Sequence, residues 1–94
     1  MFEIIVSCRG LSEQAALACL DDLFQEFAER PWQTAVRCRW DNGKILLHAR
    51  NDYDSTGQAL LDEFSDAICA CVPIEDKTIN FAVESVTTVQ GSDA

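Results

Sequence analysis

An Asn-Gly pair at positions 42 and 43 restricts the fold of this chain more than any other feature. On both sides of it, over residues 34–41 and 44–50, apolar and polar residues alternate with the period of a β-strand. Both central residues of a type I′ turn need a positive φ, and Asn-Gly adopts this turn readily. The pair therefore predicts a two-residue hairpin with a defined register. The facing pairs that we expect are Asp41–Lys44, Trp40–Ile45, Arg39–Leu46, Cys38–Leu47, Arg37–His48, Val36–Ala49 and Ala35–Arg50.

Outside the hairpin, the spacing of apolar residues predicts two strands and two helices. Strands are predicted over residues 2–8 and 78–89, and helices from Ser12 to Glu29 and between Asp54 and Pro73. Ser12 is a favourable N-cap. The helical core positions are Ala16, Leu20, Leu23, Phe24 and Phe27, then Leu60, Leu61, Phe64, Ile68, Cys71 and Val72.

The order of these elements, β-α-β-β-α-β, is the pattern of the ferredoxin-like α+β sandwich. Right-handed crossovers predict a four-stranded antiparallel sheet in the order 4-1-3-2, with both helices on one face. We expect one domain over residues 1–89 and a polar C-terminal tail over residues 90–94.

Composition adds expectations about the compartment. No apolar run approaches the about 20 residues of a membrane span, and the start of the chain does not resemble a secretory signal. Five cysteines are an odd number in a chain large enough to have a core, which favours reduced thiols over a disulfide framework. These features predict a cytoplasmic protein.

Charge is distributed unevenly along the chain. Residues 37–50 hold four basic residues and one acid, a net +3, whereas the other eighty residues hold three bases and fifteen acids, a net −12. Alternation in the strands predicts that the basic residues gather on the sheet face that the helices leave open. The open-face residues that we single out are Arg9, Arg37, Arg39, Leu46, His48 and Arg50.

The helices carry the opposite charge. Their solvent faces hold carboxylates at one-turn spacing, a pattern that costs a helix about 0.2–0.5 kcal/mol per like-charged pair. The pattern fits either a solubilising surface or a docking face for a basic partner. The acidic docking residues that we single out are Asp21, Asp22, Glu26, Glu29, Asp62, Glu63 and Asp66.

Candidate catalytic and metal-ligating residues form no recognisable constellation. On a helix, Cys69 and Cys71 point about 200° apart, so we expect no metal site and no cofactor. Cys8 and Cys38 fall on core faces, where we expect inert thiols. Cys8 also precedes a helix N-terminus, the one position where a lowered thiol pKa could arise, but no histidine is placed to activate it. His48 faces Arg37, which disfavours its protonated form.

The loop from Arg9 to Ser12 could cradle an anion, because it leads into a helix N-terminus. Acylphosphatases share this fold and chain length and have an arginine in this loop. Their longer glycine-rich phosphate loop is missing here, so a small hydrolase of that kind is the weakest of the alternatives. Direct nucleic-acid binding is also disfavoured, because the exposed positions of the central strands include no Phe, Tyr or Trp on which bases could stack. These positions are Ile5, Ser7, Leu46 and His48.

These observations predict a non-enzymatic, acidic interaction module. Its concrete form is a small inhibitor or immunity-type protein that docks its carboxylate-rich helical face on a basic, nucleic-acid-binding protein. The alternative is a regulatory domain that binds a small anion, or a homodimer, through the arginine-bearing open sheet face or an edge strand.

Overall fold

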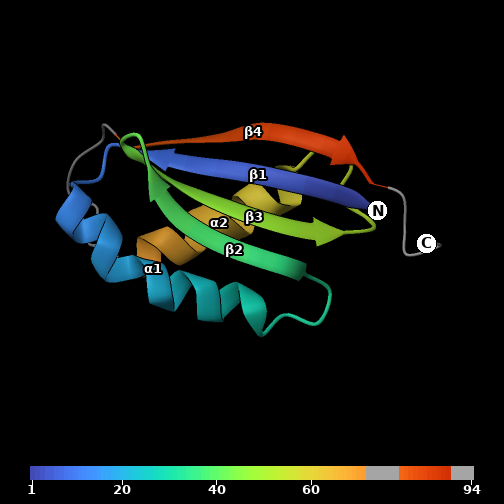
Figure 1. Cartoon of the computed structure of the whole chain (residues 1–94), viewed down its shortest axis with the longest axis horizontal. Helices are drawn as coiled ribbons and strands as arrows, with labels where there is room; N and C mark the ends of the chain where they lie inside the picture. The colour runs from blue at the N-terminus through green and yellow to red at the C-terminus, as the bar shows by residue number, and fades with distance from the viewer. Residues whose placement is uncertain (72–78, 90–94) are drawn as a thin grey trace.

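The computed structural model describes residues 1–71 and 79–89, which form a sheet with two helices behind it (Figure 1). The elements are β1 (Phe2–Arg9), α1 (Glu13–Ala28), β2 (Thr34–Asp41), β3 (Lys44–Asn51), α2 (Gln58–Cys71) and β4 (Asn80–Thr88). This is the predicted β-α-β-β-α-β order. The predictions for Val72, Pro73, Thr78 and the tail at 90–94 lie outside the described residues.

The sheet confirms the predicted topology. Its antiparallel strands lie in the order β2-β3-β1-β4, which is 4-1-3-2 read from the other edge. Both helices cover one face: α1 packs mainly on β2, and α2 packs on β1 and β4 (Figure 1). The other face of the sheet is open.

The β2–β3 hairpin confirms the type I′ turn, since Asn42 and Gly43 have φ values of 52° and 82°. The predicted register holds from Arg37 to Asp41. The predicted facing of Ala35 and Arg50 is wrong, because Thr34 faces Arg50 instead. Ala35 has a φ of 52° and occupies a β-bulge, which adds one residue to β2 opposite β3.

A second bulge lies in β4. Ile5 faces Ser85 while Val6 faces Val83, so Glu84 is the extra residue. The bulge keeps Val83 on the helix-covered side and lets Val86, rather than Ser85, face the same side as Ile4. Strict alternation along this strand would have placed Ser85 inward.

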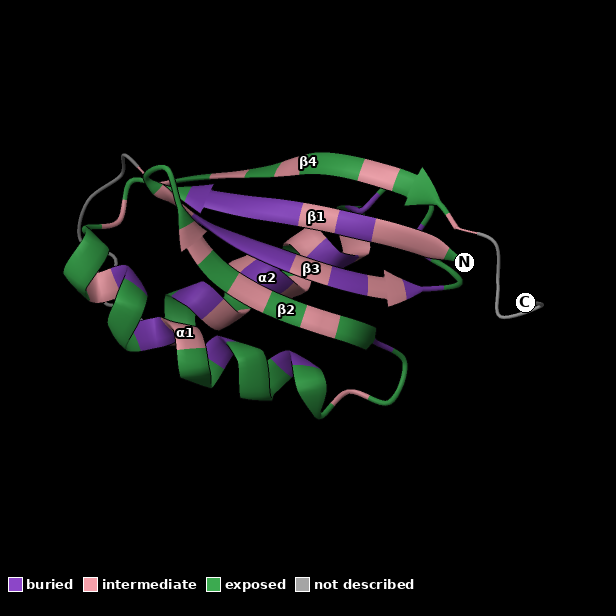
Figure 2. Cartoon of the chain, viewed as in Figure 1, coloured by how far each residue is buried: buried purple, intermediate pink, exposed green. Residues whose placement is uncertain are grey.

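The core lies between the sheet and the helices. Figure 2 shows that buried residues concentrate in the central strands β1 and β3 and on the inner sides of both helices. Ala16, Leu23 and Phe27 are buried as predicted. Phe24 is not: 45% of it is exposed, on the same side of α1 as Leu17. Phe24 is only one residue from Leu23, and a step of about 100° per residue turns it out of the core.

A disulfide joins the two helices and corrects the prediction of five reduced thiols. Cys19 of α1 and Cys71 at the end of α2 form the bond, with their Cα atoms 6.1 Å apart. The helices run antiparallel, so the first half of α1, which holds Cys19, meets the end of α2 (Figure 1). This meeting depends on tertiary packing and leaves no trace in cysteine spacing. Cys19 and Cys71 therefore no longer support the expectation of reduced thiols from which we predicted a cytoplasmic protein.

Side-chain caps hold the ends of the helices as expected. Ser12 Oγ accepts a 3.1 Å hydrogen bond from the Ala15 N–H at the start of α1. Asp54 is buried and accepts hydrogen bonds from the N–H groups of Gly57 and Leu60, at 3.0 and 2.9 Å. Within the described part of the chain, neither helix combines the length and hydropathy that crossing a membrane would require.

Candidate functional site

The open face of the sheet collects the basic residues as predicted. The β2–β3 and β1–β3 registers place Arg37, Arg39, Leu46, His48 and Arg50 on this face, and Arg9 at one end of it. Arg37, Arg39 and Arg9 are exposed, whereas His48 and Arg50 are half-buried. The open face therefore carries a layer of cationic side chains over the edge strand β2 and its neighbour β3.

Leu46, which we singled out as an open-face residue, lies on that face but is not exposed. Leu46 is only 6% exposed and Ser7 only 2%, although neither of the described helices covers them. Leu46 lies between Arg39 and Ser7 in the register, and long polar side chains can cover a buried neighbour with their aliphatic stems. This leaves little apolar surface for a face-to-face homodimer.

Two cations of the open face are engaged by carboxylates of the same chain. Lys44 Nζ lies 3.4 Å from Glu84 Oε1. Arg50 Nη2 lies 3.5 Å from Glu3 Oε2. Within the part of the chain that the structure describes, Arg37 and Arg39 have neither an ion pair nor a hydrogen-bond partner on their guanidinium groups.

Arg37, Arg39 and His48 line a hollow of about 160 Å³ on this face. Burial lowers the pKa of His48 below its ordinary value, and the positive charges of Arg37 and Arg39 lower it further. This confirms that the position disfavours protonation. The imidazole Nε2 atom is buried and has no hydrogen-bond partner among the described residues.

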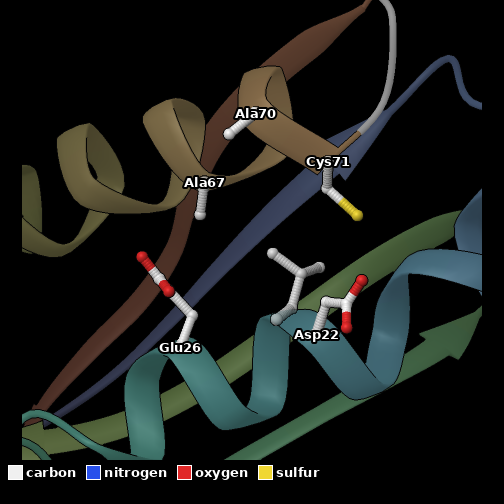
Figure 3. A pocket seen from close by; sticks show the side chains of 6 residues that line it. Asp22, Glu26, Ala67, Ala70 and Cys71 are labelled. Atoms are coloured by element: carbon white, nitrogen blue, oxygen red, sulfur yellow. The ribbon is translucent and has the colours of Figure 1, made fainter.

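On the opposite side of the molecule, a groove of about 190 Å³ lies between α1 and α2. Figure 3 shows Asp22 and Glu26 on α1, across from Ala67, Ala70 and Cys71 on α2. Leu23 also lines the groove. The groove thus combines two carboxylates with small apolar surfaces, and the Cys19–Cys71 disulfide lies at one end of it.

The structure divides the predicted acidic residues into three groups. Asp22 and Glu26 are exposed and line the groove. Asp62 and Asp66 are exposed on α2, and Glu29 is exposed at the C-terminal end of α1. Asp21 lies about 100° away from Asp22 around α1, on the side of the exposed Leu17 and Phe24. Glu63 is half-buried between the helices.

The basic residue Arg30 lies against two of these acids, Glu26 and Glu63. Its Nε atom lies 3.0 Å from Glu63 Oε1, and Nη2 lies 3.6 Å from Glu26 Oε1. The guanidinium also lies 4.5 Å from the centroid of the Phe27 ring and donates a 2.6 Å hydrogen bond to the Glu26 carbonyl. Arg30 thus connects α1 to α2 and partly neutralises two of the predicted carboxylates.

The thiols give no reactive site among the described residues. Burial raises the pKa of Cys8 to about 11 and that of Cys38 to about 12. Cys8 is fully buried, as its position on a core face predicted, and desolvation disfavours its thiolate. Among residues 1–71 and 79–89, no three His, Cys, Asp or Glu side chains gather as metal ligands.

Sequence reasoning missed the interhelical disulfide, the pair of exposed apolar side chains on α1, and the hollow beside His48. Leu17 and Phe24 are 50% and 45% exposed and stand seven residues apart, two turns along one side of the helix. The seven-residue spacing was visible in the sequence, but the same spacing occurs on buried helix faces. The hollow depends on how the long arginine side chains lie over the sheet.

Comparison with known proteins gives a likeness of fold. Neither a protein-family model nor a curated protein matches this chain. A solved structure with a similar arrangement is the de novo designed protein Foldit4, with a TM-score of 0.55 and 19% sequence identity, over 95% of this chain and 98% of that chain. At this identity the likeness concerns the fold alone, so function has to be argued from the two charged faces.

Proposed function

We propose that this protein is a non-enzymatic interaction module with a ferredoxin-like fold, whose acidic helical face docks on a basic surface of a nucleic-acid-binding protein. The observation that carries the proposal is the groove between α1 and α2. Asp22 and Glu26 stand on its rim, while Leu23, Ala67 and Ala70 provide apolar contact area. A surface with carboxylates around an apolar floor suits a cationic side chain whose aliphatic stem is also buried.

The charge of the helical face supports this assignment. Asp22 and Glu26 are one turn apart on α1, and Asp62 and Asp66 are one turn apart on α2. Such like-charged pairs destabilise a helix by about 0.2–0.5 kcal/mol each. A basic partner would offset this repulsion, and the carboxylates would occupy the positions that nucleic-acid phosphates take on the partner.

Two connections between the helices also support the proposed docking role of the helical face. The Cys19–Cys71 disulfide and the Arg30–Glu63 ion pair both connect α1 to α2. Carboxylates on a preorganised surface lose less conformational entropy on binding than carboxylates on a flexible loop. A nucleic-acid-binding partner of this kind would place the protein in the cytoplasm. The Cys19–Cys71 disulfide argues against that compartment, because cytosolic disulfides are uncommon.

The test compares two variants with the same change in net charge. Asp22→Asn/Asp66→Asn removes two carboxylates of the helical face that have no ion pair among the described residues. Asp41→Asn/Asp52→Asn, the loop variant, removes two exposed carboxylates, one at the end of β2 beside the hairpin turn and one in the loop after β3. Captured proteins from the source organism are identified for the wild type and both variants, and the affinity of any basic protein is then measured directly.

We expect the wild type and the loop variant to capture the same nucleic-acid-binding protein equally well. The helical-face variant should bind it at least about tenfold more weakly, given the energies of charge-assisted contacts. DNA or RNA should compete with the wild type for the partner. Equal binding by both variants, or binding that nucleic acid does not compete with, would refute a docking role for this face.

A further inference from the structure

We propose that the hollow formed by Arg37, Arg39 and His48 on the open sheet face binds a phosphate group, either as the free ion or as a small monoester. This site is independent of the proposed function, because it lies on the opposite side of the sheet from the α1–α2 groove. Its basis is a set of three nitrogen-bearing side chains that the hairpin register brings together.

The geometry follows from the strands. Arg37 and Arg39 are two residues apart on β2, so they lie on the same face at about 6–7 Å. His48 on β3 faces Arg37 directly, and Arg39 is its diagonal neighbour. Two guanidinium groups and one imidazole therefore surround a hollow of about 160 Å³, which has room for a phosphate group.

The two arginines are available to a ligand. Other cations of this face, Lys44 and Arg50, lie against Glu84 and Glu3, whereas Arg37 and Arg39 have no such partner within the described residues. Placing two unpaired guanidinium groups side by side is unfavourable without an anion between them. β2 is also an edge strand, so a ligand can reach the hollow from solvent.

The third observation concerns His48. Its Nε2 atom is buried and finds no hydrogen-bond partner among the described residues. Buried polar nitrogens are normally satisfied, and one that is not calls for a specific explanation. The Nε2 atom of His48 is closed to solvent in the structure, so a phosphate oxygen would become its partner once the side chains over the ring move aside. The phosphate would also offset the charges of Arg37 and Arg39, which hold the imidazole neutral.

The charge and shape of the site favour phosphate over a carboxylate. Guanidinium groups bind phosphate oxygens in a bidentate fashion, and two of them match the charge of a phosphate dianion. A carboxylate carries one charge and has two oxygens, too few to satisfy both arginines and His48 together. The acidic net charge of the whole chain should make binding depend on salt.

His48 is the one histidine of the sequence, so its ring gives a single set of NMR signals. The wild type is titrated with inorganic phosphate, with glycerol phosphate and with acetate, in a phosphate-free buffer at constant ionic strength. Arg37→Gln/Arg39→Gln tests the two guanidinium groups. Arg9→Gln is the control, because Arg9 is an exposed arginine at one end of the same face.

We expect phosphate to shift the His48 signals saturably and to raise the pKa of the ring. The double variant should bind at least about tenfold more weakly, and Arg9→Gln should stay within about twofold of the wild type. The double variant without ligand should already show a higher His48 pKa, because the charges of Arg37 and Arg39 are gone. A dispersed amide spectrum like that of the wild type verifies separately that the variant is folded. The relative affinities of phosphate and glycerol phosphate then identify the free ion or the ester as the better ligand.

Three results would overturn the proposal. One is the absence of a saturable His48 shift in phosphate. Another is equal affinity of the double variant and the wild type. The third is an equal response to acetate and phosphate, which would show general electrostatic attraction rather than a phosphate site. None of these results bears on the acidic groove, so the two proposals fail separately.

Discussion

Ser7 Oγ donates a 2.6 Å hydrogen bond to Glu84 Oε2, joining two residues that are 77 positions apart in the sequence. Glu84 is the extra residue of the β4 bulge, and its other carboxylate oxygen faces Lys44 Nζ at 3.4 Å. The hydrogen bond from Ser7 lowers the pKa of Glu84, and the charge of Lys44 contributes in the same direction. The bulge thus connects the edge strand β4 to the open face through one carboxylate.

A double-mutant cycle should detect this connection. Ser7→Ala, Glu84→Ala and the double variant should give a coupling free energy of about 1 kcal/mol at pH 7, the size of a typical charge-assisted contact near the surface. Because the pKa of Glu84 is lowered in the fold, its stabilisation is complete above the ordinary pKa of 4.5 and is lost as pH falls through the folded value. Urea unfolding over a series from pH 7 to pH 2 measures both effects. A coupling that is absent at pH 7, or that does not decrease anywhere as pH falls below 4.5, would contradict the assignment.

The Cys19–Cys71 disulfide should contribute strongly to stability, because it closes a loop with a sequence separation of 52. The chain-entropy argument gives an upper value of about 4 kcal/mol for a loop of this length. Cys19→Ser/Cys71→Ser should lower the free energy of unfolding by up to this amount, whereas Cys69→Ser, at an exposed free thiol, should leave it nearly unchanged. Thiol titration of the denatured, unreduced protein should find three free thiols; five would show that the bond does not form.

Gly57 should tolerate no side chain. Its φ is +80°, and a Cβ atom would lie 2.9 Å from Val83 Cγ1 and 3.1 Å from Ile4 Cγ2. Gly57→Ala should therefore destabilise the protein by about 2–4 kcal/mol, through backbone strain and overpacking together. Gly43 provides the matched control: its φ is +82°, but nothing lies within 4 Å of a Cβ there. Gly43→Ala should cost only about 1 kcal/mol, and similar losses at both positions would refute the packing argument.

His48 should make the stability depend on pH in a window at and below its ordinary pKa of 6.5. The fold lowers the pKa of the ring, chiefly through burial and further through Arg37 and Arg39, while Glu3 acts in the opposite direction. As pH falls below 6.5, the unfolded chain therefore binds a proton that the folded chain does not, and stability decreases. The loss between pH 7.5 and pH 5.5 should be larger for the wild type than for His48→Gln. An equal or larger loss in the variant would show that other groups dominate in this window.

Local patterns predicted most of the fold because they act over a few residues. The Asn42-Gly43 turn, the Ser12 cap and the strand alternation each depend on backbone preferences that neighbouring residues decide. Ala35 shows the limit of this approach, since an alanine with a φ of 52° is unfavourable in isolation. Only the packing of α1 on β2 and the pairing with β3 can hold it there.

The candidate sites were predictable in part. Alternation correctly assigned Arg37, Arg39 and His48 to one face, because side-chain direction in a strand has a period of two. The exposure of Leu46 and Phe24 could not be derived in this way. Leu46 is buried where no helix covers the sheet, and Phe24 is exposed although it follows a helical apolar pattern.

By itself, the sequence determined the order of the elements, the hairpin register from Arg37 to the turn, and the separation of charge into a basic and an acidic face. These properties follow from periodicity and from turn chemistry, which are local. The tertiary structure alone decided that Cys19 meets Cys71, that Glu84 reaches Ser7, and that Arg37, Arg39 and His48 enclose a hollow. Such contacts join distant segments, and their geometry depends on bulges, on the antiparallel packing of the helices and on the way long side chains cover their neighbours.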